Sequence, residues 1–450
     1  MAGHFLISVP DHFPFVIWKC RRKFGAAQNV LDNAANRNRE AEVLEMSEIT
    51  KRLSRRKFAQ LLGAGAAYTV AQRGVSWRTP LRAADTRRHF TSTPAGVVRL
   101  SANENPYGPS PMALKAMTEA FNISCRYPDE HADALIEALA KLNGVERNQI
   151  LVGNGSGEIL KLCAAAFTGS LEPGNNRPVA LLPRSRGGAL PSFIPGRGKM
   201  IVADPTFEAI LNHARVNQAE VLKIPLTGSF SHDLSKMLAA ANQGLIYICN
   251  PNNPTASITP KKELRDFLDK VPRDTMVLVD EAYHHYADSP DYESVIPLVK
   301  SHPNLIVART FSKIYGMAGL RCGYCVAQPE AMQRLRPHQT WDSVNIMAIT
   351  AAIASLGDAD QVTNGQRLNR ETKKFVTEEL SALSYASIPS QANFIMVNVK
   401  REARPIIGAL AQRGVQIGRP FPALPNHLRV TIGKRPEMET FLSAFRQVVA

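Results

Sequence analysis

The chain places a lysine and an aspartate where they could hold two parts of one ring-shaped ligand. Lys313 follows the apolar run 305–308, and Asp280 follows the apolar run 276–279. Both runs predict buried parallel strands, whose carboxyl ends meet at one edge of an open sheet. A lysine amine forms a Schiff base with a carbonyl ligand, and a carboxylate keeps a ring nitrogen protonated. The pair therefore predicts a site for a carbonyl cofactor that contains a ring nitrogen.

Two more side chains suit the same ligand, and together they indicate pyridoxal 5'-phosphate (PLP). Tyr283 stands three residues after Asp280 and could hydrogen-bond the phenolate oxygen of the PLP ring. Arg321 carries a permanent charge on a fork-shaped group, which suits a phosphate better than a lysine would. Taken alone, each residue has an ordinary explanation, because isolated lysines and arginines are usually solvated surface groups. The prediction depends on their combination.

Seven short motifs occur between residue 100 and the C-terminus. They are Asn103–Gly108, Gly153–Glu158, Asp204–Phe207, Asn250–Thr255, Asp280–Tyr283, Ser312–Lys313 with Arg321, and Arg429–Gly433. In this order they resemble the motifs of the class I and II aminotransferases, and within them the histidinol-phosphate aminotransferase group. The resemblance implies an α/β fold, the PLP-dependent transferase fold type I. A large domain with a mostly parallel sheet flanked by helices would be joined to a smaller α+β domain.

The resemblance assigns roles to most of the polar residues in these motifs. Lys313 would hold PLP covalently and then move the proton of the substrate Cα, while Asp280 would keep the ring protonated. Tyr283 and Asn253 would both hydrogen-bond the phenolate oxygen. The other implied cofactor contacts are Gly155, Ser156, Gly157, Thr310, Ser312 and Arg321 around the phosphate, Phe207 stacked on the ring, and Tyr107 from a neighbouring subunit of a homodimer.

Local sequence supports some of these assignments and departs from the family in one place. The turn 155–157 lies between the apolar run 150–152 and a helix expected to begin near Glu158, so its amides would face an anion. Glycines alone mostly mark turns. Phe207, taken alone, would be a core residue. Relatives usually have glycine where this chain has Ala256, so the turn after Asn253 departs from the family pattern.

Three residues are expected to bind the substrate by the same resemblance. Arg429, on an expected strand 428–432, would clamp the α-carboxylate with a two-pronged hydrogen bond. Asn393 would lie near that carboxylate, and Arg419 would help bind a substrate phosphate. The amino group of an L-amino acid or of histidinol phosphate would then pass to a 2-oxo acid in a ping-pong cycle.

Other activities stay open at this stage. The chain could be an aromatic amino acid aminotransferase rather than a histidinol-phosphate aminotransferase. PLP-dependent decarboxylation would keep Lys313 and Asp280 but alter the clamp, so Arg429 argues against it. A regulatory protein that binds PLP without turnover would be expected to carry a helical DNA-binding module near its N-terminus, and the leader shows a different pattern.

The charge distribution argues against nucleic acid as a partner. The net charge of +15 resembles that of a nucleic-acid-binding protein, but residues 1–90 hold 16 Lys and Arg against 7 Asp and Glu. Residues 175–200 hold 5 basic and no acidic side chains, so the remainder is almost neutral. Hydrophobic residues make up 44% of the chain, yet no apolar run reaches the roughly 18 residues of a membrane-spanning helix. Small-molecule substrates and no stable membrane anchor are expected.

The basic leader resembles a twin-arginine export signal. Ser54–Phe58 contains the two arginines, and a mildly apolar stretch follows within 54–71. Export signals lie near a chain start, so Met46 is expected to be the natural initiator and 1–45 a misassigned extension. A periplasmic or otherwise exported enzyme is predicted, and the alternative is a cytoplasmic enzyme with a basic extension that carries no address.

The rest of the chain is expected to divide into three parts. Residues 91–126 would form an N-terminal arm and part of the small domain, residues 127–340 the large PLP-binding domain, and residues 341–450 the small C-terminal domain. The Gly, Pro and Arg-rich segment 175–199 would be a basic surface insertion, followed by a strand over 199–203.

Cysteine and histidine suggest no metal site. Cys322 and Cys325 are three apart on an expected strand, so their side chains would point to opposite faces and would not form a disulfide. His284 and His285 could contact substrate, but adjacent histidines without a third ligand are more often polar packing in a loop.

Overall fold

The computed structural model describes residues 96–170 and 196–450, all within one unit of the chain. The leader 1–90, with its expected export signal at 54–71, lies outside the described residues. Most of the basic insertion 175–199 lies outside them too. In the described part of the chain, no helix is both long and apolar enough to span a membrane.

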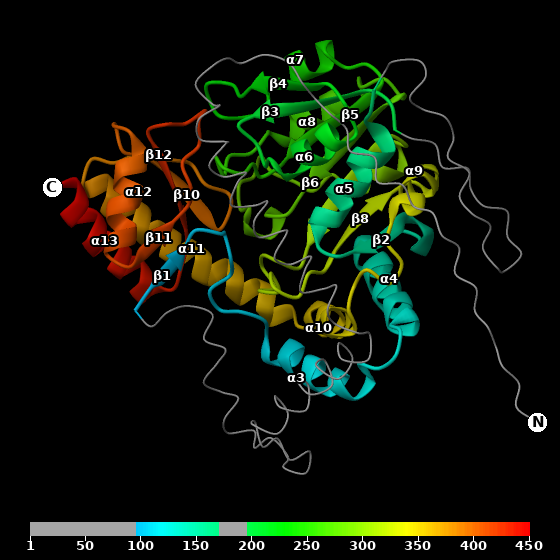
Figure 1. The fold of residues 1–450 in the computed structure, drawn as a ribbon, viewed down its shortest axis with the longest axis horizontal. Helices are drawn as coiled ribbons and strands as arrows, with labels where there is room; N and C mark the ends of the chain where they lie inside the picture. Colours follow the sequence, from blue (N-terminus) through cyan, green and yellow to red (C-terminus); the bar gives the residue numbers. More distant parts are fainter. Residues whose placement is uncertain (1–95, 171–195) are drawn as a thin grey trace, which may run out of the picture. The chain divides into compact units, whose positions relative to one another are not determined.

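A seven-stranded sheet forms the centre of the larger part of the fold (Figure 1). Its strands lie in the order β2-β8-β7-β6-β5-β3-β4. Their bounds are β2 (Ile150–Gly153), β3 (Lys199–Asp204), β4 (Val221–Pro225), β5 (Gly244–Cys249), β6 (Thr275–Asp280), β7 (Leu305–Thr310) and β8 (Gly323–Ala327). Strands β4, β3, β5, β6 and β7 are parallel, and β8 is antiparallel to both β7 and β2. The predicted mostly parallel sheet is confirmed.

Helices cover both faces of this sheet, because successive side chains of its buried strands point to opposite sides. In β6, Val277 and Val279 pack into one hydrophobic core, and Met276 and Leu278 pack into another. The first core includes α3 (Pro111–Ala120), α4 (Asp129–Asn143), α7 (Leu234–Ala239), α8 (Lys261–Leu268) and α10 (Ile346–Leu356). The second includes α5 (Ser156–Phe167), α6 (Ala209–Val216) and α9 (Pro329–Leu335).

The same alternation separates the two closely spaced cysteines. Cys322 lies in the first core and Cys325 in the second, and both are free thiols. They therefore lie on opposite faces of the sheet, as their spacing predicted.

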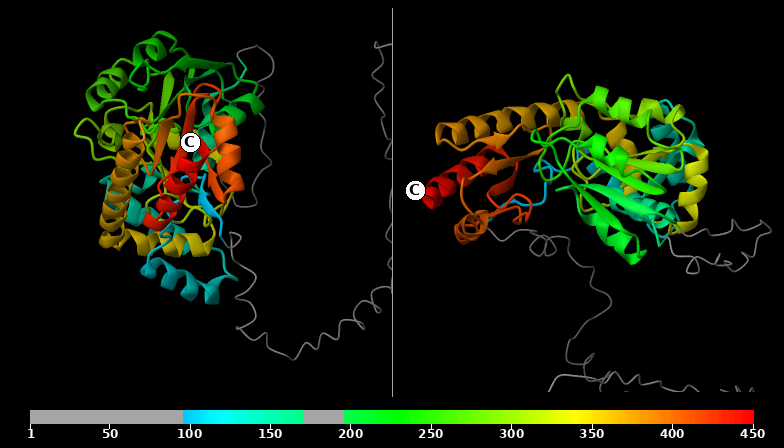
Figure 2. Two further views of the ribbon diagram at one scale, coloured as in Figure 1. Left: turned by 90° about the vertical axis from the view of Figure 1, so that its left-hand side faces the viewer. Right: turned by 90° about the horizontal axis from the view of Figure 1, so that it is seen from above.

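A third hydrophobic core belongs to the C-terminal part of the chain and to β1 (Val98–Leu100). Here β1 pairs in parallel with β11 (Val415–Ile417), and β10 (Phe394–Asn398) lies between β9 (Ser387–Ile388) and β12 (His427–Thr431) in an antiparallel sheet. The helices are α11 (Ala359–Ala382), α12 (Ala403–Gln412) and α13 (Arg435–Val449). Figure 2 shows α11 extending from the large sheet toward these small sheets. Helix α10, by contrast, packs with α3 and α4.

Candidate active site

Lys313 lies three residues beyond the carboxyl end of β7, beside the segment that follows β1. Its Nζ donates hydrogen bonds to the backbone oxygens of Asn103 at 3.0 Å and Ala102 at 3.4 Å. It also lies 5.4 Å from the centre of the Tyr283 ring. Burial, and next the positive charge of Arg429, lower the pKa of Lys313 to about 8. The amine is therefore held near the centre of the site and loses its proton more readily than a surface lysine.

Asp280 ends β6 and is almost fully buried. The hydroxyl of Tyr247, on the neighbouring strand β5, donates to its Oδ2 at 2.9 Å, and the amide of Ala282 donates to its Oδ1 at 3.1 Å. Burial raises the pKa of Asp280 to about 6, although these two hydrogen bonds oppose the shift. The carboxylate is therefore oriented by its neighbours but has no cationic partner within hydrogen-bonding distance among the described residues.

Two asparagines hold the hydroxyl of Tyr283 from different parts of the chain. Asn103 Nδ2 donates to this oxygen at 3.1 Å, and Asn253 Nδ2 donates to it at 3.3 Å. Asn103 is fixed in turn by Thr431 of β12, which receives its backbone N–H and donates to its Oδ1. The sequence placed Asn253 and Tyr283 together, but it gave Asn103 no role.

The residues predicted to bind a phosphate surround the start of α5. Arg321 Nη1 donates to Ser312 Oγ at 3.3 Å, and Thr310 Oγ1 donates to the same oxygen at 2.9 Å. Gly155 has a φ of +72°, and a Cβ on it would come within 2.2 Å of Arg321 Nη2. Only glycine leaves room for that guanidinium. Helix α5 begins at Ser156, slightly earlier than predicted, and its first-turn amides lie beside this cluster.

Arg429 lies on β12 and reaches the same network from the opposite side. Its Nη1 donates to Asn253 Oδ1 at 2.8 Å, and its Nη2 donates to the backbone oxygen of Ser101 at 2.7 Å. Its Nε is buried and has no hydrogen-bond partner among the described residues. Asn393 Oδ1 is unpartnered in the same way, while Asn393 Nδ2 donates to the backbone oxygen of Asn103 at 3.1 Å. Both side chains therefore retain capacity for a polar ligand.

The turn after Asn253 forms although alanine replaces the usual glycine. Ala256 is fully buried and has a φ of +58°, the left-handed conformation that favours glycine. This conformation costs an L-residue about 1 to 2 kcal/mol. The Ala256 amide donates to Asn252 O, and its carbonyl receives the amide of Gln391, so the surrounding contacts hold the turn in place.

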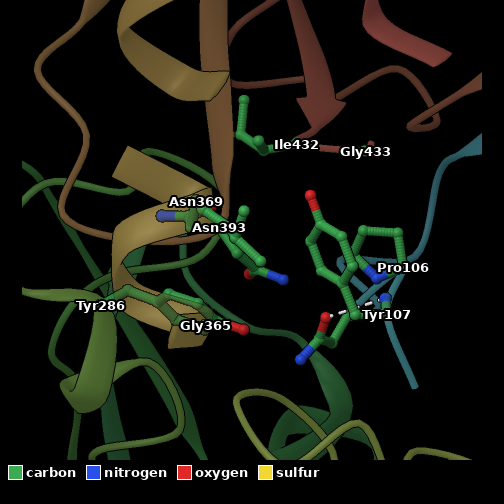
Figure 3. Close-up of a pocket in the computed structure, with 10 residues that line it drawn as sticks. Pro106, Tyr107, Tyr286, Gly365, Asn369, Asn393, Ile432 and Gly433 are labelled. Carbon is green, nitrogen blue, oxygen red and sulfur yellow. Dashed lines mark hydrogen bonds between the residues drawn. The ribbon is translucent and has the colours of Figure 1, made fainter. Parts of the chain in front are cut away.

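Tyr107 does not join the cluster around Lys313. Its side chain is 43% exposed and lines a small pocket beside Asn393, Ile432 and Gly433, with its hydroxyl pointing toward the last two (Figure 3). The Tyr107 amide donates to the side-chain oxygen of Asn105 at 3.1 Å. The prediction that Tyr107 serves a neighbouring subunit stays a prediction.

Phe207 and the two adjacent histidines have different surroundings. Phe207 is 37% exposed, so it is not a core residue. His284 and His285 lie against each other with ring centres 3.7 Å apart and planes tilted by 42°, and His285 packs edge-on against Tyr315. The histidine pair is therefore engaged in packing, as its spacing favoured.

Arg419 lies on the loop after β11 and faces two different partners. Its guanidinium pairs with the carboxylate of Glu208, which precedes α6. It also lies over the ring of Phe421, with Cζ 4.4 Å from the ring centre, and Arg429 Cζ lies 5.2 Å from that centre. Two arginines therefore share one aromatic ring. The sequence gave no role to Glu208 or Phe421.

The fold and this cluster define a PLP-dependent enzyme of transferase fold type I. Comparison with known proteins gives the family. The sequence model of the family "Aminotransferase class I and II" matches residues 95–445, and the chain belongs to that family. It is 38% identical over 359 residues to a histidinol-phosphate aminotransferase of Moorella thermoacetica, covering 79% of this chain and 86% of the relative.

Two further relatives have the same printed name. One, from Symbiobacterium thermophilum, is 37% identical over 354 residues, covering 78% of this chain and 90% of the relative. A crystal structure of histidinol-phosphate aminotransferase from Sinorhizobium meliloti in complex with PLP is 26% identical, with a TM-score of 0.69. It covers 78% of this chain and 91% of that chain. The chain is therefore a transaminase similar to the histidinol-phosphate aminotransferases.

PLP is the cofactor implied by this family, and the residues present fit it. Because Gly155 has no Cβ, the Arg321 guanidinium can lie against the backbone there, and it can bind a phosphate together with the nearby backbone amides. The free acceptor capacity of buried Asp280 suits a cationic ring nitrogen. The roles of the individual side chains toward PLP remain the predictions made from the sequence.

Replacing Tyr247 with phenylalanine is expected to lower kcat about tenfold. The change removes a hydrogen bond to a buried carboxylate, which is worth about 1.5 to 3 kcal/mol, and should raise the pKa of Asp280. Steady-state rates from pH 5.5 to 8 should show the largest loss at the acidic end. Tyr385→Phe, whose ring packs on Phe445, is the control. An unchanged pH profile for Tyr247→Phe would contradict the assignment.

The rate of PLP uptake by the cofactor-free protein is expected to rise as the pH passes through about 8. Only the neutral amine attacks an aldehyde, and a lowered pKa makes Lys313 neutral at a lower pH than an ordinary lysine. Arg429→Gln removes a positive neighbour, so its profile should move to higher pH. Stopped-flow absorbance after mixing with PLP measures both profiles. A midpoint near 10 in the unmodified protein would contradict this expectation.

Proposed function

We propose that this chain transfers the amino group of histidinol phosphate, or of an amino acid with a planar side chain of similar size, to a 2-oxo acid. The observation that supports it most is the pair of arginines on the Phe421 ring. Arg429 stands next to the Lys313 and Tyr283 cluster, and Arg419 stands beyond the ring. A phosphate ester offers several anionic oxygens to such a pair of arginines, and the similarity to histidinol-phosphate aminotransferases supports the same choice.

The side chains divide the chemical work between binding and proton transfer. PLP, when bound, accepts the electrons released when the substrate Cα loses its proton. The Lys313 Nζ is placed to hold the cofactor and then to take that proton and return it. The buried carboxylate of Asp280 stabilises positive charge beside it, and the Tyr283 hydroxyl, held by Asn253, positions a phenolate oxygen.

Arg429 is proposed to orient the substrate. Two of its N–H groups are engaged by Asn253 and Ser101, and the buried Nε has no partner among the described residues. The α-carboxylate of an amino acid, or an oxygen of the phosphate ester that histidinol phosphate carries beside its Cα, would satisfy it. Since this guanidinium is fixed by two protein contacts before substrate arrives, little entropy is lost on binding.

Aromatic amino acids form a second candidate class of donor. Phe394 and Phe421 both lie near the Arg429 guanidinium, with ring centres 5.8 Å and 5.2 Å from its Cζ. The Glu208 carboxylate already neutralises Arg419, which reduces its need for an anionic substrate group. A phenylalanine or tyrosine donor, which carries no phosphate, would therefore be compatible with the site.

A panel of donors tests the proposal directly. Purified protein loaded with PLP is mixed with histidinol phosphate, phenylalanine, tyrosine or alanine in the presence of a 2-oxo acid, and the keto product is measured. The proposal expects the highest kcat/KM with histidinol phosphate. Brisk turnover of the aromatic donors without turnover of histidinol phosphate would reject it in favour of the second candidate. A shift in the absorbance of bound PLP on adding a donor, without any keto product, would indicate a ligand-binding protein without turnover.

We also propose that the enzyme is a homodimer in which Tyr107 reaches the PLP phosphate of the partner copy. One continuous segment exposes several large apolar side chains, which a second copy of the chain could cover. They are Tyr107, Met112, Leu114, Phe121 and Tyr127. A mixture of Lys313→Ala and Tyr107→Ala subunits tests the shared site, because each mixed dimer would contain one complete site. Activity should recover after mixing, and a monomer by light scattering would refute the proposal.

Export through the segment 54–71 is proposed as well, although this segment lies outside the described residues. The support is the pair of arginines in Ser54–Phe58 and the apolar stretch after it. Sequencing the N-terminus of the protein isolated from its native cells checks the proposal. A mature protein that retains this segment in the cytoplasm would contradict it.

A further inference from the structure

Arg419, the arginine expected to help bind a substrate phosphate, already has an anionic partner in this chain. Arg419 Nη2 donates a hydrogen bond to Glu208 Oε2, and Arg419 Nη1 donates to the backbone oxygen of Pro420 at 3.1 Å. Glu208 precedes α6, next to the end of β3, whereas Arg419 follows β11. The ion pair therefore bridges the large sheet and the small sheets at the substrate side of the site.

Within the described residues, the Glu208 carboxylate pairs with no side chain other than Arg419. It occupies the N-cap position of α6, where a side-chain oxygen often accepts a hydrogen bond from the first turn of a helix. Its side chain caps no helix amide. Both partners of the pair are about half exposed, at 50% for Glu208 and 51% for Arg419, so burial does not force them together. The Glu208 carboxylate is thus available mainly to Arg419.

A continuous set of contacts connects Glu208 to the centre of the site. Arg419 lies over Phe421, Arg429 lies over the same ring, and Arg429 donates to Asn253. Glu208 also directly follows Phe207 along the chain. A substrate group that reaches Arg419 must therefore come close to the Glu208 carboxylate.

We propose that Glu208 is a specificity-determining residue that disfavours phosphate-bearing substrates relative to uncharged aromatic ones. This inference rests on the proposed function and refines its substrate class. A phosphate monoester carries about −1.5 to −2 charge at pH 7, so it must displace or lie beside the carboxylate that holds Arg419. Phenylalanine carries only the shorter α-carboxylate in that place, which Arg429 can hold without displacing Glu208. Glu208 therefore tunes the balance between the two donor classes that the site accepts.

The test compares the unmodified holoenzyme with Glu208→Gln, which keeps the shape and removes the charge. We expect the ratio of kcat/KM for histidinol phosphate to kcat/KM for phenylalanine to rise about fivefold, the scale of one exposed ion pair. The inhibition constant of inorganic phosphate against phenylalanine turnover should fall by a similar factor. In an Arg419→Gln background the same Glu208→Gln change should move neither quantity, because the partner of Glu208 is then absent.

The matched control is Glu379→Gln. Glu379 pairs with Arg446 between α11 and α13, with exposures of 38% and 48%, away from the Phe421 ring. Its removal should leave the substrate ratio and phosphate inhibition unchanged. A fall in the ratio with Glu208→Gln, an unchanged ratio, or an equal rise in Glu379→Gln would each overturn the inference. Failure of the unmodified enzyme to turn over any donor would instead reject the proposed function and, with it, the inference.

Discussion

Replacing Lys313 with alanine should lower the rate of transamination by about 10⁴-fold or more. Lys313 Nζ donates to the Asn103 carbonyl and lies beside the Tyr283 ring. Removing this amine removes the group that would bind the cofactor covalently and the base that would take the Cα proton. Noncovalent contacts to the cofactor should persist. Steady-state rates measure the loss, and the absorbance of bound PLP shows whether the cofactor is still taken up.

Lys373 provides a demanding control for this prediction. Burial lowers its pKa to about 8 as well, and its Nζ donates to the backbone oxygens of Ser390 and Ala392. If a low pKa were sufficient for catalysis, either lysine could serve. The proposed chemistry also requires the amine to lie beside Tyr283, and Lys313 meets this requirement. Lys373→Ala should keep most of the activity per folded molecule. A small soluble amine such as methylamine should restore part of the activity of Lys313→Ala, and activity that survives the substitution without such an amine would refute the assignment.

The positions of the main strands could be predicted because local hydrophobicity determines them. The run 276–279 became β6, and the run 305–308 became β7, so Asp280 and Lys313 emerge at neighbouring strand ends as expected. Strand direction is not a local property. The sequence therefore did not show that β8 runs antiparallel between β7 and β2.

The residues that sequence reasoning missed act through contacts between distant segments. Tyr247 has the pattern of an ordinary buried strand residue, and only the pairing of β5 with β6 brings its hydroxyl to Asp280. Asn103 lies in a motif that was recognised, but its contact with Tyr283 spans 180 positions. The pairing of Glu208 with Arg419 spans 211 positions and depends on the packing of the small sheets. Residue type and local spacing carry no signal for such pairs.

Replacing Asp280 with asparagine should lower kcat by about 10³-fold while preserving the packing of β6. The amide has the same shape, and its oxygen can accept from the Ala282 amide while its NH2 group donates to the Tyr247 hydroxyl, but it carries no charge to stabilise a cationic ring nitrogen. At a buried position this electrostatic contribution amounts to several kcal/mol. Single-turnover absorbance with an amino donor measures the loss. Asp266→Asn, which breaks an exposed pair with Lys262, should change the rate less than twofold.

The same substitution should have a pH-dependent effect on stability that identifies the charge as the cause. Burial raises the pKa of Asp280 from 3.8 to about 6, so the cofactor-free protein carries no cost from this group below pH 3.8 and bears the full cost above pH 6. That cost is roughly 3 kcal/mol. Cofactor-free Asp280→Asn should therefore be about 3 kcal/mol more stable than the unmodified protein at pH 8 and only about 1 kcal/mol more stable at pH 4.5.

PLP should remove this difference, because a cation beside the carboxylate offsets the cost of burying its charge. Thermal unfolding with and without PLP tests the prediction at both pH values. The rise in Tm on adding PLP should be larger at pH 8 than at pH 4.5 for the unmodified protein and nearly independent of pH for Asp280→Asn. An equal, pH-independent rise in both proteins would mean that Asp280 does not face the charged part of the cofactor.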